Sequence, residues 1–473
     1  MMFAWAVHYT SGAIQEWTPF LLVASYFVFS TCVYMLADTF ILGVFWFIYL
    51  VTNTYIAATT VLEAFLSLTA VHDSRKAVEK LAAKEWTFPT PDADLPVFDL
   101  IIVAYLPNEQ DIILSRIHYL LHQIVYPADK LRVNVIYNTP VPIEPVEQTM
   151  ADLAAKHDNL RVIKVPCSTS KADNINYYCR QVETEADVTA IFDCDHYPHP
   201  YGPRWAIERL MDRKVDIVQG RCIILNANEN LLTATIALEF DKIYAVSHPG
   251  RASMFGFGLF CGSNGYWRTS LLKRLQMDDS MLTEDIDSAL RAFGDGANAV
   301  HELNAISYEL APVSVSAFWK QRLRWAQGWL QASIRHVRLV WERAPPKPRS
   351  LKQRFGILSL LVIREWSYYL LTQYLCLVLS IIFKSFPVTG EEWLRILFFQ
   401  YPVAWWLFFF SVISLLATLY ITVAVRSEFV QWWMMGVFVC SYPLQLVLMA
   451  VIGLFGHARE VAKYVKWNPT PRN

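Results

Sequence analysis

The sequence has few charged residues and lacks the cysteine patterns typical of zinc sites and disulfide-built domains. Asp, Glu, Lys and Arg make up only 18% of the 473 residues, whereas soluble domains usually contain about 25%. The eight cysteines are scattered without a C-x-x-C pair, so we expect reduced thiols that bind no zinc. The net charge of −1 is not the basic excess of a nucleic-acid-binding protein, and we expect no nucleic-acid partner.

The shortage of charge is confined to two apolar regions, which lie on either side of an ordinary globular sequence. A membrane span needs about 20 apolar residues. Five segments meet this need, namely residues 20–37, 39–60, 366–386, 402–425 and 430–454. The first two are separated at Asp38. The first apolar region is too long for a cleavable signal peptide and has no basic start, so we expect it to be retained.

The charges beside the apolar segments predict how the chain is oriented. Residues 335–354 are rich in Lys and Arg, so the positive-inside rule places the globular part in the cytosol. The C-terminal tail is also basic, but three spans after the globular part would place that tail outside. The sequence therefore leaves five or six spans open.

These patterns divide the chain into five parts. We expect an N-terminal transmembrane hairpin (1–69), a cytosolic domain (70–313), amphipathic interface helices (314–365), C-terminal transmembrane helices (366–456) and a basic tail (457–473).

Short apolar runs alternate with helical patterns in the cytosolic domain. The expected strands are residues 98–104, 133–137, 161–165 and 188–192, and helical patterns cover 109–122, 146–156 and a segment from Lys171. This alternation is typical of a doubly wound α/β domain. Ligands bind such sheets beyond the carboxyl ends of the strands, so we expect a site where these strands end.

Two aspartates directly follow the fourth expected strand, at Asp193 and Asp195. Carboxylates one residue apart can share one Mg²⁺ or Mn²⁺ ion, and these ions commonly bridge carboxylates to phosphates. A solvated surface turn is the alternative interpretation. His196 and His199 lie beside the pair, either as metal ligands or as the polar wall of a pocket.

Residues 283–285 (TED) begin an expected helix over 285–293. Thr283 is a good N-cap and acidic residues favour a helix start, so this motif fits a purely structural role. A carboxylate here also fits a general base that takes a proton from an acceptor hydroxyl, and Asp285 is our candidate.

Residues 321–325 (QRLRW) lie on an amphipathic stretch over 315–340. Arg324 is suited to pair with a diphosphate, and Trp325 to stack on a sugar face. An interfacial helix with snorkelling arginines and an anchoring tryptophan is the alternative.

In order and spacing these motifs, with residues 171–174 (KADN) and 261–264 (CGSN), resemble those of processive, membrane-integrated family-2 glycosyltransferases, the group of cellulose, chitin and hyaluronan synthases. The resemblance covers residues 98–330. It implies a GT-A-like (Rossmann-like) α/β domain inserted between transmembrane helices, a UDP-glucose or UDP-N-acetylglucosamine donor, and Mg²⁺ or Mn²⁺. It also implies inverting synthesis of a β-linked polysaccharide, which leaves through a channel in the plasma membrane.

The resemblance further implies residue roles. The donor site would comprise Ala104, Tyr105, Glu109, Lys171, Asp173, Asp193, Gln321 and Arg324. Asp193 and Asp195 would hold the metal. Thr283, Glu284 and Asp285 would form the catalytic group, with Asp285 as base. The acceptor would meet Trp325, Gly262, Ser263 and Asn264.

Other functions and roles stay open at this point. A non-processive lipid glycosyltransferase of the ceramide glucosyltransferase type carries a comparable motif set, whereas a transporter would be expected to have more intramembrane charges. Glycines between residues 250 and 265 suit either a loop that touches the substrate or a turn near the membrane. Trp405, Trp406, Trp432 and Trp433 suit either a glycan channel or interface anchors. An oligomer or accessory subunits are also left open.

Overall fold

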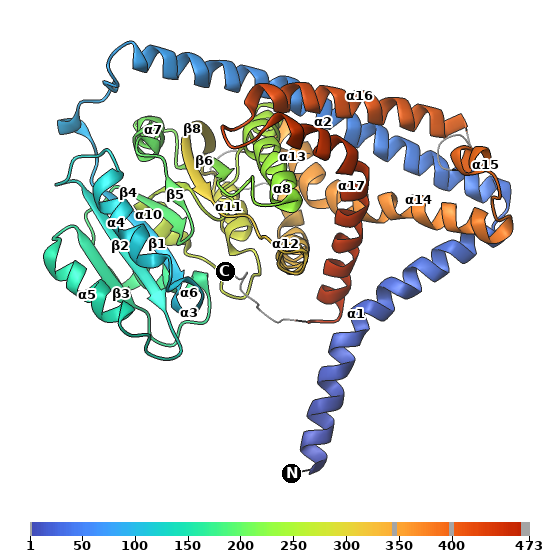
Figure 1. Ribbon diagram of the computed structural model, residues 1–473, viewed down its shortest axis with the longest axis horizontal. Helices are drawn as coiled ribbons and strands as arrows, with labels where there is room; N and C mark the ends of the chain where they lie inside the picture. Colours follow the sequence, from blue (N-terminus) through green and yellow to red (C-terminus); the bar gives the residue numbers. More distant parts are fainter. Residues whose placement is uncertain (1, 343–347, 397–401, 465–473) are drawn as a thin grey trace.

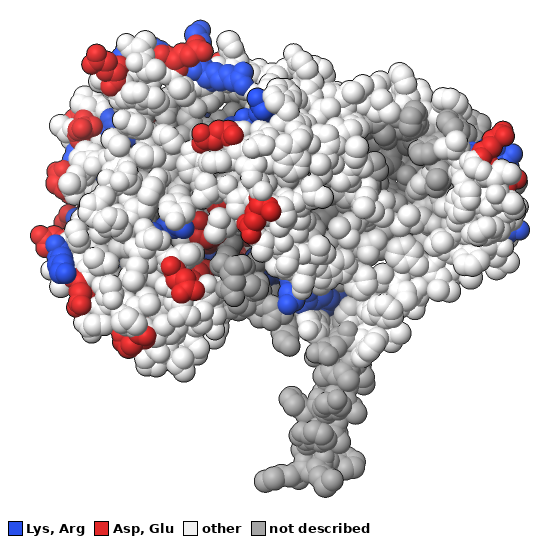
Figure 2. Space-filling model, in the orientation of Figure 1, with Lys and Arg blue, Asp and Glu red and all other residues white. Residues whose placement is uncertain are grey.

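Two parts of different character lie side by side in the computed structural model, which describes residues 2–342, 348–396 and 402–464. A mixed α/β domain lies on the left of Figure 1, and long helices lie on the right. Figure 2 shows charged side chains spread over the α/β domain, whereas the helices present an almost uncharged face up to the end that carries α15. The predicted division between a globular and an apolar part is therefore visible in three dimensions.

An eight-stranded mixed sheet forms the centre of the α/β domain, in the order β3-β2-β1-β4-β7-β6-β8-β5. Its strands are β1 (Phe98–Tyr105), β2 (Leu131–Asn138), β3 (Leu160–Lys164), β4 (Val188–Asp193), β5 (Tyr197–Pro198), β6 (Ile217–Ile224), β7 (Gly265–Arg268) and β8 (Ala299–Glu309). The four predicted strands are confirmed as the parallel half, β3 to β4. Because β1 lies between β2 and β4, its carboxyl end borders the crevice where such sheets bind ligands.

Helices cover both faces of this sheet. They are α3 (Leu106–Glu109), α4 (Ile113–Gln123), α5 (Val146–Lys156), α6 (Lys171–Gln181), α7 (Gly202–Leu210), α8 (Leu231–Lys242), α9 (His248–Phe255), α10 (Thr269–Leu275) and α11 (Glu284–Gly294). Alternate residues of β1 enter opposite cores, because Ile101 and Val103 pack on one face, and Leu100 and Ile102 on the other. The continuous apolar run of β1 follows from this two-sided burial.

The helix expected over residues 109–122 is present as α4, which begins later than expected, after the short helix α3. The carboxylate of Glu109 accepts a hydrogen bond from the backbone N–H of Tyr105 at 2.8 Å. This bond closes a short turn at the end of β1, and α4 begins only at Ile113.

The apolar part consists of long helices and of one amphipathic helix beside the domain. These are α1 (Met2–Leu36), α2 (Thr39–Ala82), α12 (Val315–His336), α13 (Leu351–Leu358), α14 (Arg364–Lys384), the short α15 (Gly390–Leu394), α16 (Pro402–Val425) and α17 (Trp432–Val461). The predicted break at Asp38 is present, and its carboxylate accepts hydrogen bonds from the backbone N–H groups of Phe40 and Ile41.

Within the described residues, four helical segments are long and apolar enough to cross a membrane, namely Trp17–Leu36, Phe40–Ala82, Leu351–Lys384 and Leu444–Val461. Val412–Val425 and Trp432–Tyr442 are shorter apolar helices. Residues 351–363, which we expected among the interface helices, form α13 and a π-helical stretch, Ser359–Ile363, that leads directly into α14. A capping box between Ser350 and Gln353 starts α13, and no helix-breaking residue follows.

The α/β domain is docked directly on the long helices. Gly250 of α9 lies so close to α2 that a Cβ atom added there would be 2.0 Å from the carbonyl oxygen of Glu63. Arg251 forms an ion pair with Glu63 at 3.2 Å, and Arg221 of β6 contacts both Asp241 (2.7 Å) and the carbonyl oxygen of Val425 in α16 (2.6 Å). Gly250 therefore lies where α9 and α2 cross at close distance, and it is not part of a loop.

Candidate active site

A cavity of about 820 Å³ contains most of the predicted site residues. It opens at the carboxyl ends of β1 and β4, where a ligand of such a sheet is expected. The predicted residues that line it are Ala104, Tyr105, Glu109, Lys171, Asp193, Gly262, Ser263, Thr283, Glu284, Asp285, Gln321, Arg324 and Trp325. Segments far apart in the sequence thus meet at one place.

Asp193, Asp195 and His196 form an acidic cluster at the end of β4. Their ligand atoms lie within 4.8 Å of one another. The hydroxyl of Ser263 accepts a hydrogen bond from the backbone N–H of Asp193 at 3.1 Å, which holds the strand end in place. Two carboxylates and an imidazole at this spacing fit a divalent cation. His199 lies outside the cluster, and its Nδ1 accepts a hydrogen bond from the backbone N–H of Tyr201.

The ring of His196 is held by two residues of β8 that the motif search missed. Its Nε2 lies 3.0 Å from Glu309, and its Nδ1 lies 3.1 Å from the hydroxyl of Ser307. Burial lowers the pKa of His196, but the charges of Glu309, Asp195 and Asp193 together outweigh burial and raise it. Glu309 also lines the cavity. No strand was expected at residues 299–309, so the sequence motifs gave no signal for Glu309.

Lys171, at the start of α6, brings a positive charge to the acidic cluster. Its Nζ lies 2.5 Å from Oδ1 of Asp193 and donates a hydrogen bond to the carbonyl oxygen of Gly262 at 2.6 Å. Burial alone would lower the pKa of Lys171, but Asp193 and Glu284 raise it. The lysine is therefore charged beside the predicted metal ligands, where a diphosphate would need a cation.

Glu284 and Asp285 form a partly buried carboxyl pair at the start of α11. Burial raises the pKa of both groups, and the neighbouring charge of Asp285 helps to raise that of Glu284 to about 7. The positive charge of Arg324 lowers the pKa of both groups. Gly262 (φ 91°) approaches closely, since a Cβ atom there would lie 2.9 Å from Oδ2 of Asp285. A raised pKa suits a general base near neutral pH.

Thr283 occupies the N-cap position of α11, but its side chain makes no capping hydrogen bond. The hydroxyl of Thr283 therefore does not cap α11, as the sequence had suggested it would.

Helix α12 presents the QRLRW motif to the cavity. Arg324 donates a hydrogen bond to the carbonyl oxygen of Leu282 at 3.0 Å, one residue before Thr283. The guanidinium carbon of Arg322 lies 4.4 Å from the centre of the Trp325 ring, and Arg322 also pairs with Glu239 at 2.8 Å. The indole of Trp325 is thus held by a cation at the cavity wall.

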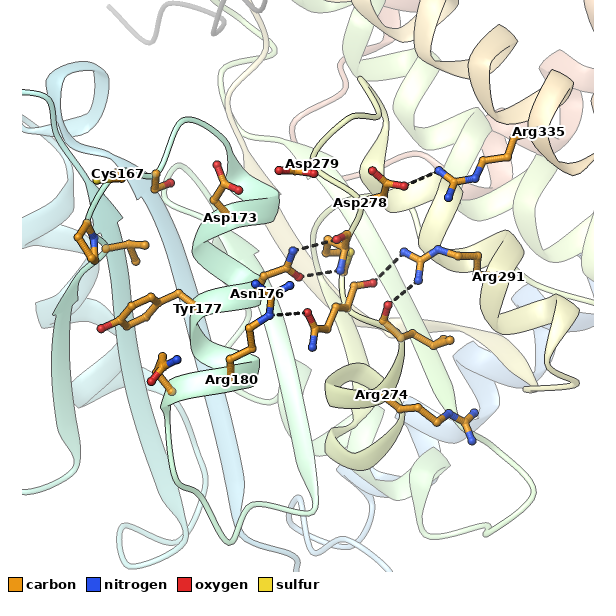
Figure 3. A pocket seen from close by; sticks show the side chains of 17 residues that line it. Cys167, Asp173, Asn176, Tyr177, Arg180, Arg274, Asp278, Asp279, Arg291 and Arg335 are labelled. Atoms are coloured by element: carbon orange, nitrogen blue, oxygen red, sulfur yellow. Dashed lines mark hydrogen bonds and ion pairs between the residues drawn. The ribbon is translucent and has the colours of Figure 1, made fainter.

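Three predicted residues do not line this cavity. Asp195 is fully buried within the acidic cluster. Asp173 faces a second, polar cavity of about 630 Å³ (Figure 3), and its carboxylate accepts a hydrogen bond from the backbone N–H of Thr169. Asn264 is buried in the sheet, where it donates hydrogen bonds to the carbonyl oxygens of Arg221 and Ala305. A direct contact of Asp173 or Asn264 with substrate is not supported by these positions.

The opposite end of the main cavity reaches the long helices. Its lining there includes Trp329, Arg364, Tyr368, Met449 and Ile452, from α12, α14 and α17. The guanidinium carbon of Arg364 lies 3.7 Å from the centre of the Trp329 ring. By contrast, the four tryptophans that were considered for a glycan channel are exposed and line neither cavity; these are Trp405, Trp406, Trp432 and Trp433.

The mixed sheet, with paired aspartates at the end of a central strand, has the GT-A-like fold of the nucleotide-sugar-dependent glycosyltransferases. Residues 96–328 match the sequence model of the family described as "Glycosyltransferase like family 2". This part of the chain is therefore a family 2 glycosyltransferase domain.

Curated relatives are similar to this chain over part of their length. A probable glycosyltransferase of Bacillus subtilis (strain 168), YdaM, is 26% identical over 238 residues, which are 50% of this chain and 56% of that protein. Probable glucomannan 4-beta-mannosyltransferase 7 of Oryza sativa subsp. japonica is 28% identical over 214 residues, which are 44% of this chain and 36% of that protein. The chain thus spans about half or less of the length of these relatives.

Among solved structures, a mannosyltransferase from Pyrobaculum calidifontis, PcManGT, in complex with GDP-Man and Mn²⁺, superimposes with a TM-score of 0.48 and 18% identity. That match covers 78% of this chain and 99% of the other.

Proposed function

We propose that this protein is an inverting, processive glycosyltransferase that extends a β-linked polysaccharide from a cytosolic UDP-sugar and exports it through its transmembrane helices, most naturally at the plasma membrane. The observation that carries this proposal is the single cavity that joins Asp193 and Asp285 to Tyr368 and Met449. A donor at the strand ends would face an acceptor that extends toward the apolar helices.

Different residues of the cavity have different roles in the proposed reaction. A divalent cation held by Asp193 and Asp195 would neutralise charge on the departing diphosphate. Lys171 and Arg324 both line the cavity, and their positive charges act on Asp285. Asp285 takes the proton of the acceptor hydroxyl, whose oxygen attacks the anomeric carbon as the bond to the diphosphate breaks. Attack from the opposite face inverts the configuration at that carbon.

The donor sugar is proposed as glucose or N-acetylglucosamine, carried by UDP. Mannose is a second candidate, because several relatives are named glucomannan 4-beta-mannosyltransferases. The cavity end at α14 and α17 would also admit a lipid hydroxyl, as in a ceramide glucosyltransferase, so the product must be identified as well as the donor.

The test is sugar transfer by the full-length protein purified in detergent. Radiolabelled UDP-glucose, UDP-N-acetylglucosamine and GDP-mannose are supplied with Mg²⁺ or Mn²⁺. We expect one donor to yield a polymer, and Asp285→Asn to lower turnover by roughly 10²–10⁴-fold, the usual contribution of a general base. Asp295→Asn, an exposed position at the far end of α11, is the matched control.

Each other outcome changes the proposal. A single sugar on a lipid would establish the lipid transferase, and full activity of Asp285→Asn would remove Asp285 as the base. No transfer from any of the donors would overturn the proposed activity.

A further inference from the structure

The segment that leads into Glu284 and Asp285 is anchored on α12 as well as on its own domain, where Met277 exchanges two hydrogen bonds with Asn176 of α6. The backbone N–H of Leu282 donates to Oε1 of Gln331 at 3.1 Å, and the carbonyl oxygen of Leu282 accepts from Arg324 at 3.0 Å. Asp278, at the other end of the same loop, pairs with Arg335 of α12 at 2.5 Å (Figure 3). Three residues spread along α12 therefore hold the loop before the proposed base.

The backbone of α12 also touches the catalytic motif directly. A Cβ atom at Gly328 would lie 2.6 Å from Cγ2 and 2.8 Å from the backbone nitrogen of Thr283. Because no side chain separates the two, a small shift of α12 must be transmitted to Thr283.

On its other side, α12 is held in the same manner by α17. A Cβ atom at Gly456 would lie 2.7 Å from Cβ of Ala326 and 2.9 Å from the backbone nitrogen of Gln327. Glu460, one turn further along α17, accepts hydrogen bonds on Oε2 from Nε2 of Gln331 (2.8 Å) and of Gln327 (3.2 Å). Close backbone contacts therefore join α17 to α12, at Gly456, and α12 to Thr283, at Gly328.

The side-chain amide of Gln331 connects Glu460 of α17 to the loop that contains Leu282. Its oxygen accepts from Leu282 while its nitrogen donates to Glu460. Because the amide is planar, the bond to Glu460 fixes which end faces Leu282; without it, the amide is free to rotate and present its NH₂ group to the Leu282 N–H.

We propose that Glu460 is a positioning residue, which acts through Gln331 to place Leu282 and hence Asp285, so that the last apolar helix controls the catalytic base. Glu460 does not line the cavity, so it touches neither donor nor acceptor. Movement of α17 would reach Asp285 through this connection. The inference rests on the proposed function and adds a means of regulating its chemical step.

The test compares turnover and donor affinity in the purified full-length protein. We expect Glu460→Ala to lower kcat roughly tenfold, the size of one lost charge-assisted hydrogen bond, while the donor KM stays within roughly twofold because Glu460 itself does not line the cavity. Glu460→Gln retains an acceptor oxygen and should keep most of the activity. Lys463→Ala is the matched control, since it removes only an exposed contact to the other oxygen of Glu460.

A double-mutant cycle separates positioning from general destabilisation. If Glu460 acts through Gln331, then Glu460→Ala combined with Gln331→Ala lowers kcat no further than the worse single variant. Three outcomes would overturn the positioning role. The losses in kcat of the two single variants could multiply in the double variant. The kcat of Glu460→Ala could be unchanged, or it could fall only as much as the amount of folded protein falls. In those cases an active wild type leaves the proposed function standing. An inactive wild type overturns both.

Discussion

Nε2 of His336, at the end of α12, lies 2.7 Å from Oδ1 of Asp287, which is two residues beyond Asp285 in α11. Asp287 is fully buried, and its second oxygen accepts from Arg291 at 2.7 Å. This pair joins the helix of the proposed base to the helix that carries the QRLRW motif. It also makes Asp287 a point where the stability of the site depends on pH.

Asp287→Asn should lower the free energy of unfolding by about 2–3 kcal/mol at pH 7, because His336 and Arg291 lose a buried anionic partner. Burial alone would raise the pKa of Asp287, but His336 and Arg291 outweigh it and lower the pKa. The stabilisation is therefore present above the ordinary carboxyl pKa of about 4 and is lost as the pH falls further. Thermal unfolding in detergent across this range should show a shallower acid decline in the variant; identical profiles would contradict this.

Arg324→Gln should move the acid limb of the pH–activity profile upward. Arg324 favours the ionised forms of Glu284 and Asp285, so its loss raises a pKa that burial has already raised. The base must be ionised to act, and activity is lost as the pH falls through its pKa, so we expect an upward shift of roughly one unit. The measurement is kcat/KM against pH, with the exposed Arg338→Gln as control. A limb that stays in place would exclude Asp285 and Glu284 as the titrating groups.

Chelation of divalent cations should abolish turnover, and Mn²⁺ or Mg²⁺ should restore it. Asp193→Asn removes one carboxylate of the cluster, so we expect the Mn²⁺ concentration for half-maximal turnover to rise at least roughly tenfold. Asp187→Asn, just before the opposite end of β4, supplies the control. Turnover that is indifferent to chelator would show that Asp193 and Asp195 serve another purpose.

Gly328→Ala should displace the catalytic motif. Its new methyl group would lie 2.6 Å from Thr283, so α12 and the TED segment must separate. We expect a loss of about 1–3 kcal/mol in the free energy of unfolding together with reduced turnover. Gly436→Ala in α17 meets nothing within 4 Å and should leave both unchanged. Normal activity of Gly328→Ala would show that the loop tolerates movement of α12.

The proposed cytosolic position of residues 70–313 can be tested with a native thiol. Cys167 is exposed between β3 and α6. A membrane-impermeant maleimide should label it in inverted vesicles but not in intact cells, and Cys167→Ser should remove that label. Labelling of Cys167 in intact cells would place the domain on the other side.

Local pattern was sufficient to predict the parallel half of the sheet. Buried parallel strands are continuous apolar runs, so residues 98–104 and 188–192 could be recognised without knowing their neighbours. The placement of Asp193 at a ligand-binding edge followed from the same reasoning, because a residue at a strand end shares an edge with the other strand ends.

Other features of the site depend on contacts between segments that are distant in the sequence. Glu309 reaches His196 because β8 pairs with β6 and β5, a pairing with no local signature. Asp173 and Asn264 do not line the main cavity, and their side chains bind nearby backbone groups. The cavity's second end exists only because α12, α14 and α17 pack together. The four parallel strands, the motifs and the apolar segments could be recognised from the amino-acid sequence, because each depends on neighbouring residues. Tertiary packing determines which side chains meet in one cavity.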